Sequence, residues 1–369
     1  MFNRALGTGS MRGCIVVDGS ATCVEDLPIP IPAAGELLLR VQACAVNRLD
    51  LLQVRGIASP PPGVTEVLGV ECVGTIVSRS SDCRSDFAEG EQVVALVSGG
   101  AYAEFVASHE STCFRTTTTP QLAGARSLAE LASIPEAFMT AYQLLFFVSR
   151  VSPGESVLIH AGASSVGQAL IQMCVRIGVA VFATSRTRQK CALCKSLGAA
   201  DCFLLPPEDA RFADKVIDAN HGPVHHVLCC IGHSYFYENV HALAVDGTYT
   251  LYGTMGNAGC TAASSEANWM PKLMAKRIKL CTTTLRNRSA EYKAELAKAL
   301  REDDVCGLSS TKPFIVNVSQ VFTLEDLEAA HTVMASSANA GKLVLTVTHN
   351  ADSVEFLRRE LDELSRRFK

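Results

Sequence analysis

The sequence lacks any apolar run long enough to cross a membrane. It also lacks an excess of positive charge, because 33 Lys and Arg residues stand against 37 Asp and Glu residues, for a formal net charge of -4. Such a chain has no basic surface to attract nucleic acid, so we expect neither a nucleic-acid partner nor a membrane. Charged residues make up only 19% and hydrophobic residues 48%, which is typical of a folded protein with a large core.

A secretory signal is also missing, although the chain contains 15 cysteines. Most of them lie inside apolar segments, as Cys174, Cys229 and Cys230 do. Reduced, buried thiols in a cytoplasmic enzyme are therefore expected in place of disulfides. Residues 1–12 contain two arginines and no acid, which is compatible with a mitochondrial transit peptide or with a leader before a second start at Met11.

A chain of 369 residues exceeds what one hydrophobic core usually supports, so two domains are expected. In the first third, short apolar runs such as residues 37–41 and 93–97 alternate with turn-forming stretches, which predicts a mostly β domain. From residue 135 strands and helices alternate, which predicts an α/β domain with a doubly wound parallel sheet. The strands expected there are residues 157–160, 179–184, 224–230, 248–252 and 278–284, with helices at 166–177 and 188–197.

The last part of the chain changes character again. A helix over residues 324–335 and a strand over 343–348 are expected to rejoin the first domain. In residues 350–369, Val354, Leu357 and Leu361 fall on one helical face, which predicts a helical extension that packs against the body or a partner subunit. We therefore expect a first domain over residues 11–134, an α/β domain over 135–289, a return over 290–349 and the extension.

The most specific motif is Gly162-Ala-Ser-Ser-Val-Gly167, which follows one expected strand and opens the next helix. This context is typical of the turn that binds a dinucleotide. We expect Gly162 to permit a tight turn and Gly167 to allow close packing of helix and strand. Amides at a helix N-terminus attract the pyrophosphate. The predicted cofactor-binding loop consists of Gly162, Ala163, Ser164, Ser165, Val166 and Gly167.

The end of the second strand lacks the acid that NAD enzymes carry for the ribose hydroxyls. Residues 184–190 are Thr-Ser-Arg-Thr-Arg-Gln-Lys. Arg186 and Lys190 suit a 2′-phosphate, because cations form charge-assisted hydrogen bonds with it. Cations are otherwise poorly matched to the start of a helix. The predicted cofactor is therefore NADPH.

Several further stretches, taken together with this turn, carry a resemblance. They are Ala45-Val-Asn-Arg-Leu-Asp-Leu-Leu52, Pro60-Pro-Pro-Gly63, Leu68-Gly-Val-Glu-Cys-Val-Gly74, Leu251-Tyr-Gly-Thr-Met-Gly256 and Gly341-Lys-Leu-Val-Leu345. The sequence resembles the zeta-crystallin-like quinone oxidoreductases of the medium-chain dehydrogenase/reductase superfamily, and within them the tumour-suppressor-induced branch. The resemblance implies a GroES-like substrate domain, a Rossmann domain and a homodimer joined through the Rossmann sheets.

Zinc alcohol dehydrogenases share this fold, and the resemblance tests whether this chain binds their metal. Asn47 stands where those enzymes carry a cysteine ligand, and Val70 stands where they carry a histidine. A catalytic zinc normally needs three protein ligands. Cys191 and Cys194 form a Cys-x-x-Cys, but they fall in an expected helix and have no second pair. We therefore expect no metal.

The resemblance also implies roles for single residues. Asn47 is expected near the nicotinamide and the substrate, as the catalytic residue, and Thr140 beside the nicotinamide ring. On the residues alone, a loop-capping amide at Asn47 and a hydroxyl bonded to its own helix at Thr140 remain open. Ala58 stands in the substrate pocket where relatives often carry a tyrosine. The residues expected along the rest of the cofactor groove are Ile231, Gly232, Tyr252, Gly253, Thr254, Leu285 and Arg286.

Without a metal, the expected acceptors are already electrophilic. Quinones and activated enones take up hydride without a strong acid, because the negative charge delocalises onto oxygen. Two alternatives stay open: an enoyl-thioester reductase, against which the missing tyrosine at Ala58 counts, and an NADPH-binding protein of low turnover with a structural or RNA-binding role.

Overall fold

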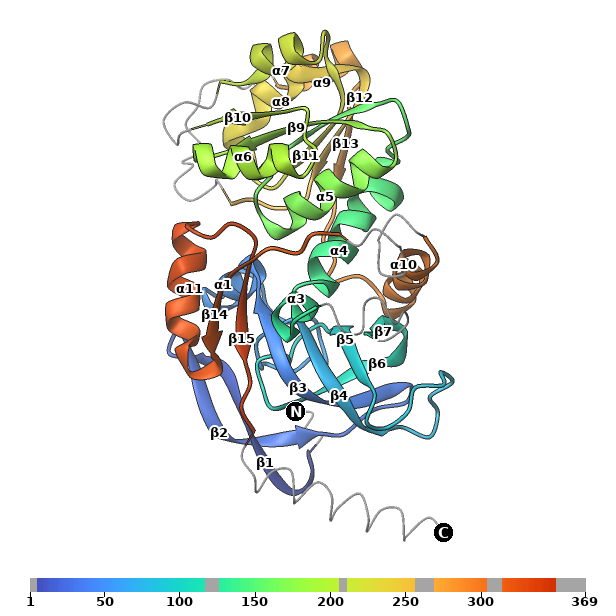
Figure 1. The fold of residues 1–369 in the computed structure, drawn as a ribbon, viewed down its shortest axis with the longest axis vertical. Coiled ribbons are helices and arrows are strands. Elements are labelled where there is room, and N and C mark those ends of the chain that lie inside the picture. The colour runs from blue at the N-terminus through green and yellow to red at the C-terminus, as the bar shows by residue number, and fades with distance from the viewer. Residues whose placement is uncertain (1–4, 117–125, 206–210, 256–268, 304–313, 350–369) are drawn as a thin grey trace. The chain divides into compact units, whose positions relative to one another are not determined.

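The computed structural model describes residues 5–116, 126–205, 211–255, 269–303 and 314–349 (Figure 1). The described chain divides into two units. The first unit takes its residues from Met1–Glu136, Arg286–Arg301 and Val316–Lys369, and the second from Ala137–Leu285 and Glu302–Ile315. The helical extension expected over residues 350–369 lies outside the described residues. Among the described helices, none has both the length and the apolar character needed to span a membrane.

The first unit is built on a seven-stranded sheet in the order β14-β15-β3-β4-β5-β7, with β6 paired to β3. Its strands are β3 (Glu36–Val46), β4 (Glu71–Arg79), β5 (Gln92–Leu96), β6 (Phe105–His109), β7 (Cys113–Arg115), β14 (Val318–Thr323) and β15 (Lys342–Thr346). Its helices are α1 (Arg48–Val54), α3 (Leu128–Ala132), α10 (Ala290–Glu302) and α11 (Leu327–Ser336), with short 3-10 turns η1 (Glu110–Thr112) and η5 (Leu324–Asp326). The strand expected at residues 37–41 falls within β3, and the one expected at 93–97 differs from β5 by one residue at each end.

A two-stranded antiparallel ribbon precedes this sheet, formed by β1 (Ala5–Val17) and β2 (Ser20–Pro30). Cys14 and Cys23 face each other in its register and form a disulfide. The expectation of reduced thiols is therefore wrong for this pair. The sequence did not predict the ribbon, and only its pairing brings these two cysteines together. The other 11 cysteines of the described residues are free, and ten of them are buried.

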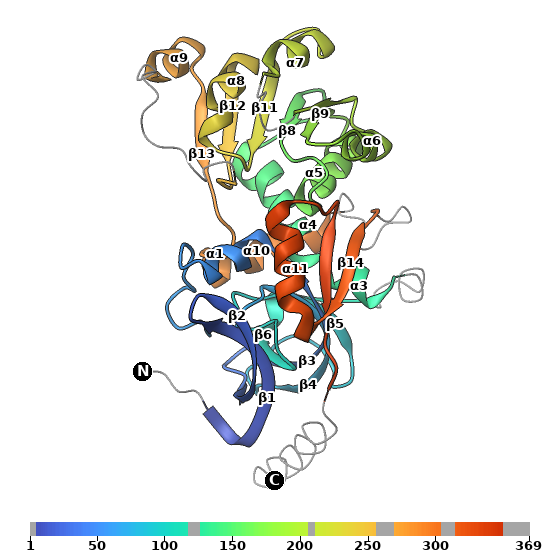
Figure 2. The same cartoon turned by 90° about the vertical axis from the view of Figure 1, so that its left-hand side faces the viewer.

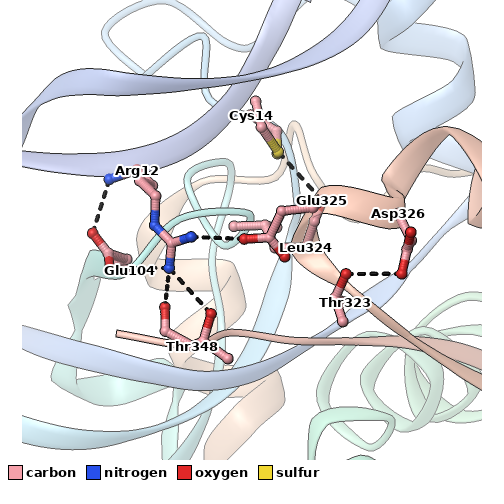
Figure 3. A network of polar contacts seen from close by, with 9 residues as sticks. Arg12, Cys14, Glu104, Thr323, Leu324, Glu325, Asp326 and Thr348 are labelled. Carbon is pink, nitrogen blue, oxygen red and sulfur yellow. Dashed lines mark hydrogen bonds and ion pairs between the residues drawn. A yellow bond between two sulfur atoms is a disulfide. The ribbon is translucent and has the colours of Figure 1, made fainter. Parts of the chain in front are cut away.

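The C-terminal segment rejoins the first unit, as the sequence predicted. β15 pairs antiparallel with β3 and parallel with β14, so a segment some 300 residues along the chain completes the sheet. Arg12 of β1 ties this return to the ribbon (Figure 3): it donates to Glu325 Oε1 at 2.7 Å and to the Thr348 carbonyl, and its own amide donates to Glu104 Oε2 at 2.9 Å. The Cys23 sulfur lies 3.3 Å from the carbonyl oxygen of Leu324.

The second unit contains a six-stranded parallel sheet in the order β10-β9-β8-β11-β12-β13. Its strands are β8 (Ser156–Ile159), β9 (Ala180–Ser185), β10 (Asp201–Leu204), β11 (Val224–Cys229), β12 (Leu243–Leu251) and β13 (Lys279–Thr282). Its helices are α4 (Pro135–Tyr142), which begins at the border of the units, α5 (Ser165–Arg176), α6 (Arg188–Ser196), α7 (Ala213–Ala219), α8 (Phe236–Ala242) and α9 (Trp269–Lys276), with η2 (Gln143–Ser149) and η3 (His233–Tyr235).

The strand order of the second sheet places its ligand site. Because parallel crossovers are right-handed, α5 and α6 cover one face and α8 and α9 the other, as Figure 2 shows. β8, β9 and β10 follow one another toward one edge of the sheet, and β11, β12 and β13 toward the other, so the strand order reverses between β8 and β11. Open sheets of this kind bind their ligands at that point, beyond the carboxyl ends of the strands. This is the Rossmann arrangement that the sequence predicted, beside a mostly β GroES-like unit.

Candidate functional site

The turn after β8 presents the start of α5 in the way that the sequence predicted. Ala161 adopts a left-handed backbone with φ of 51°, and the Gly162 amide donates to the Thr184 carbonyl at 3.0 Å. Ser164 caps the helix, because its hydroxyl accepts a hydrogen bond from the Gly167 amide at 3.1 Å. The helix that follows has 12 residues, and the amides at the start of such a helix are suited to holding an anion.

Both glycines of the turn are required by space. A Cβ at Gly162 would lie 2.8 Å from Ala183 Cβ and 2.9 Å from Cys194 Sγ, whereas a Cβ at Gly167 would lie 2.6 Å from the Ala161 carbonyl oxygen. The left-handed residue of the turn is Ala161 and not Gly162. Gly162 is needed because β9 and α6 pack directly against it.

His160 supports this turn from beneath. Its Nδ1 lies 2.9 Å from Thr184 Oγ1 and its Nε2 lies 2.6 Å from Asn239 Oδ1, and the residue is fully buried. Burial lowers the pKa of His160 from 6.5 to about 4. The ring is therefore neutral at physiological pH, and it fixes the ends of β8 and β9 relative to each other.

The cations after β9 stand at the start of α6. Thr187 caps this helix, because its hydroxyl accepts from the Lys190 amide at 3.2 Å. Arg186 is exposed and Lys190 is half-buried. Burial lowers the pKa of Lys190, and the charge of Arg186 lowers it further, so the two cations lie close enough to repel each other. Two like charges held together in this way suit a dianion such as a 2′-phosphate.

The remaining expected cofactor residues of the second unit follow neighbouring strands. Ile231 and Gly232 come directly after β11, and Tyr252, Gly253 and Thr254 come directly after β12. The Tyr252 amide donates to the Cys229 carbonyl at 2.9 Å, which joins these two strand ends. The carboxyl ends of parallel strands lie at the same edge of the sheet, so these loops lie at the same edge as the turns after β8 and β9. Thr140 lies half-buried on α4, and Leu285 is buried after β13.

The first unit contributes a buried group of polar side chains around Asn47. Its amide Nδ2 donates to Glu71 Oε1 at 2.9 Å, and Lys342 donates from Nζ to both Asn47 Oδ1 and Glu71 Oε1. The second oxygen of Glu71 accepts from the Glu136 amide at 2.9 Å. Glu71 and Lys342 are fully buried. Both polar atoms of the Asn47 side chain therefore bond to the ion pair of Glu71 and Lys342. Sequence analysis did not single out Lys342.

A second buried pair begins on the same helix. The Asp50 carboxylate accepts at Oδ2 from the Asn47 backbone amide and from the Tyr102 hydroxyl, both at 2.7 Å. Its Oδ1 is buried and has no hydrogen-bond partner within the described ranges of the chain. Burial raises the pKa of Asp50 to about 6, although both hydrogen bonds lower it. Neither Asp50 nor Tyr102 was expected at the site. Asp50 stands three residues after Asn47 in the motif, and that spacing is the signal that would have found it.

A zinc ion does not fit these residues. The carboxylate that would serve as a ligand, Glu71, already holds the ammonium of Lys342, and Asn47 and Val70 offer neither a thiolate nor an imidazole. Among the described residues, no group of three or more His, Cys, Asp or Glu side chains is placed to hold a metal ion. Cys191 and Cys194 lie on α6, as predicted.

Ala58, expected in the substrate pocket, lies in the loop after α1. Its amide donates to the Leu52 carbonyl at 3.2 Å, and its side chain is partly exposed. The methyl group offers no hydrogen bond, so any polar contact to a substrate from the first unit has to come from another residue.

Comparison with known proteins agrees with this architecture. Residues 33–144 match the alcohol dehydrogenase GroES-like domain, and residues 165–301 match the zinc-binding dehydrogenase domain. The human synaptic vesicle membrane protein VAT-1 homolog-like is 30% identical over 331 residues, which cover 86% of this chain and 76% of that protein. The quinone oxidoreductase of Rattus norvegicus is 27% identical over 325 residues, which cover 87% and 92%.

A solved mycobacterial structure in complex with NADPH is also similar, with 28% identity and a TM-score of 0.74 over 91% of this chain and 99% of that one. Fold and site together define a two-domain, nicotinamide-dependent oxidoreductase. The chain belongs to the medium-chain dehydrogenase/reductase superfamily, within its zeta-crystallin-like quinone oxidoreductase group. It is an oxidoreductase of this superfamily.

Proposed function

We propose that this protein transfers hydride from NADPH to a quinone or an activated enone, without a metal. The observation that carries the proposal is the ammonium of Lys342 on Glu71, which takes the place of a metal cation beside Asn47. An acceptor that is reduced here has no metal ion to polarise it. It must therefore be electrophilic on its own, as quinones and enones are.

The cofactor would be held by the second unit. Its pyrophosphate would lie on the amides at the start of α5, in the loop Gly162–Gly167, and its 2′-phosphate would lie between Arg186 and Lys190. When bound, NADPH supplies a hydride. Thr140, Leu285 and the residues after β11 and β12 would line the nicotinamide and adenosine halves, and Asn47, held by Glu71 and Lys342, would be the catalytic residue.

The assay compares NADPH oxidation with 1,2-naphthoquinone, phenanthrenequinone, an enoyl-CoA and a blank. We expect turnover with the two quinones and little with the enoyl-CoA, because Ala58 offers no phenol to protonate a thioester enolate. Faster turnover with the enoyl-CoA would make the protein an enoyl-thioester reductase. NADPH binding without consumption of any acceptor would show a protein of low turnover.

The phosphate-binding role of Arg186 and Lys190 makes a prediction about cofactor choice. Replacing either by alanine should weaken NADPH binding by about 1–3 kcal/mol and leave NADH binding nearly unchanged, since each loses one charged hydrogen bond to the 2′-phosphate. Fluorescence titration with both cofactors measures this. Arg188→Ala, an exposed arginine on the same turn, is the matched control and should retain the preference. If NADH binding weakened as much as NADPH binding, Arg186 and Lys190 would not be the residues that bind the 2′-phosphate.

A homodimer and a cytoplasmic location are part of the same proposal. The 11 free cysteines of the described residues, against the one pair in the Cys14–Cys23 disulfide, support a reducing compartment. The edge strand β13 exposes Leu280 to 45%, and α9 exposes Met270 and Met274, which supports association through this edge of the sheet.

A further inference from the structure

Arg286 is a buried cation of the first unit whose outer nitrogens lack partners. The residue is 7% exposed, and its Nε donates to the Ser98 carbonyl at 2.7 Å. Both Nη1 and Nη2 are buried, and no hydrogen bond from either reaches any described residue. A guanidinium remains protonated in proteins, so these nitrogens are charged donors without acceptors. Buried groups of this kind are uncommon, because water or a partner normally satisfies them.

The side chain is held rigidly at its base. Lys293 donates from Nζ to the Arg286 carbonyl and to Ser98 Oγ, each at 2.7 Å, and Lys293 is itself buried. Ser98 therefore binds the arginine through its carbonyl and the lysine through its hydroxyl. The guanidinium has little freedom to turn toward another acceptor, and its two outer nitrogens are fixed in advance for a ligand.

The charges around Arg286 indicate what kind of ligand fits. Burial lowers the pKa of Arg286, and the carboxylates of Asp50, Glu136 and Glu66 raise it. A ligand that arrives with a full negative charge would meet these three carboxylates. A neutral carbonyl oxygen binds without this repulsion. The hydrogen bonds that it accepts from both outer nitrogens become stronger when negative charge develops on it during the reaction.

We propose that Arg286 binds the carbonyl oxygen of the acceptor and stabilises the negative charge that forms on it. This inference rests on the proposed function. In an enone, hydride adds to the β-carbon, the electron pair of the C=C bond moves into the α-carbon–carbonyl bond, and the carbonyl pair moves to oxygen. Water then delivers the proton to the enolate. A quinone takes up the same hydride and becomes the hydroquinone anion, which water also protonates.

The role differs from the one that the family resemblance assigns, which is contact with the cofactor. Ala58 removes the phenol that relatives often carry, and Lys342 is committed to Glu71 and Asn47. Arg286, by contrast, is a cation of the first unit with hydrogen-bond donors that have no acceptor among the described residues. It would supply the charge stabilisation that a metal gives elsewhere.

The experiment compares Arg286→Gln and Arg286→Lys with the wild type and with Arg288→Gln. Arg288 is an exposed arginine two residues along, stacked on Tyr292, and serves as the matched control. For Arg286→Gln we expect kcat/KM for 1,2-naphthoquinone and for an enone to fall about 100-fold, with the NADPH dissociation constant changed by less than about twofold. Arg286→Lys should have a kcat/KM roughly tenfold higher than Arg286→Gln, because lysine keeps the positive charge but lacks the two parallel N–H donors of the guanidinium.

Each other result decides against the proposal. Weaker NADPH binding, with normal acceptor kinetics at saturating NADPH, would return Arg286 to the cofactor. Unchanged kinetics and binding would show that only water satisfies the guanidinium. If Arg286→Gln unfolds in a thermal melt, Arg286→Lys carries the test through the same two measurements.

A separate measurement distinguishes failure of the proposed function from failure of this inference. If the wild type turns over no acceptor, calorimetric titration of phenanthrenequinone into the wild type and into Arg286→Lys decides. If the variant binds phenanthrenequinone about tenfold more weakly than the wild type, Arg286 binds the acceptor but the proposed reaction is wrong. Equal binding, or none to either protein, would reject Arg286 as the acceptor-binding residue.

Discussion

At the scale of single residues, His160 shows how the turn between β8 and α5 depends on a neutral imidazole. Its two ring nitrogens join Thr184 at the end of β9 and Asn239 of α8. The aromatic rings of Phe212 and Tyr235 contact it edge-on at centroid distances of 5.0 and 4.9 Å. A charged imidazolium would lose solvation in this position, and that is the cause of its low pKa.

The lowered pKa of His160 predicts acid sensitivity. The pKa of His160 is about 4 in the folded protein and 6.5 for an ordinary histidine, so this side chain binds a proton more readily in the unfolded chain. The stability that this histidine contributes is complete above pH 6.5 and declines as the pH falls toward 4. At pH 5 the loss should be about 2 kcal/mol relative to pH 7.5.

Urea unfolding without cofactor at the two pH values checks this. His160→Gln should be less stable than the wild type at pH 7.5, and the gap should narrow at pH 5, since glutamine does not titrate. His221→Gln, at an exposed histidine, is the control. A gap that stays constant or widens at pH 5 would contradict the assignment of a neutral, buried ring.

At the scale of elements, the junction of β8 and α5 is the part of the site that local sequence determined most fully. The start of α5, its serine cap and the positions of both glycines follow from the residues between Ile159 and Gly167. The expected helix 166–177 differs from α5 by one residue at each end. The expected strand at 278–284 is shorter in the structure, and the helices α7, α8 and α9 were not predicted, because their short apolar runs have no clear period.

Gly167→Ala should test the packing of this junction. The added Cβ would meet backbone oxygens, which cannot move as a flexible side chain does, so the start of α5 has to shift. We expect a loss of about 1–3 kcal/mol in the free energy of unfolding and NADPH binding at least about tenfold weaker. Chemical unfolding and fluorescence titration measure the two effects.

Gly178→Ala at the other end of the same helix is the control. Its φ is +75° and nothing lies within 4 Å of an added Cβ, so it carries only the conformational cost. NADPH affinity should be unchanged in that variant. If both variants weakened NADPH binding equally, the loss would reflect helix stability and not the geometry of the turn.

At the scale of the whole molecule, the exposed edge of the second sheet bears on assembly. β13 lies at one end of the described strand order and exposes Leu280, and an unpaired edge with apolar side chains is a surface for pairing. Leu280→Lys should raise the dissociation constant of the proposed dimer by about tenfold or more, because a charge would replace buried apolar area.

Light scattering after size exclusion, over a range of concentrations, measures this change. Val321→Lys is the matched control, because Val321 is 52% exposed on β14, at the edge of the other sheet. That variant should remain as associated as the wild type. A monomeric wild type, or a dimer that only Val321→Lys breaks, would contradict association through β13.

The sequence by itself determined the two kinds of unit and the turn between β8 and α5, and it predicts the cofactor, because each depends on residues close together in the chain. Periodicity sets the strands and helices, the glycines define the turn, and the missing acid after β9 indicates a phosphorylated ribose. Only the tertiary structure decided which distant groups meet: Lys342 with Glu71 and Asn47, Asp50 with Tyr102, Cys14 with Cys23, and Arg286 with no acceptor for its outer nitrogens in the described part of the chain. These groups are separated by up to about 300 positions, and the free energy of a buried charge depends on its neighbours in space.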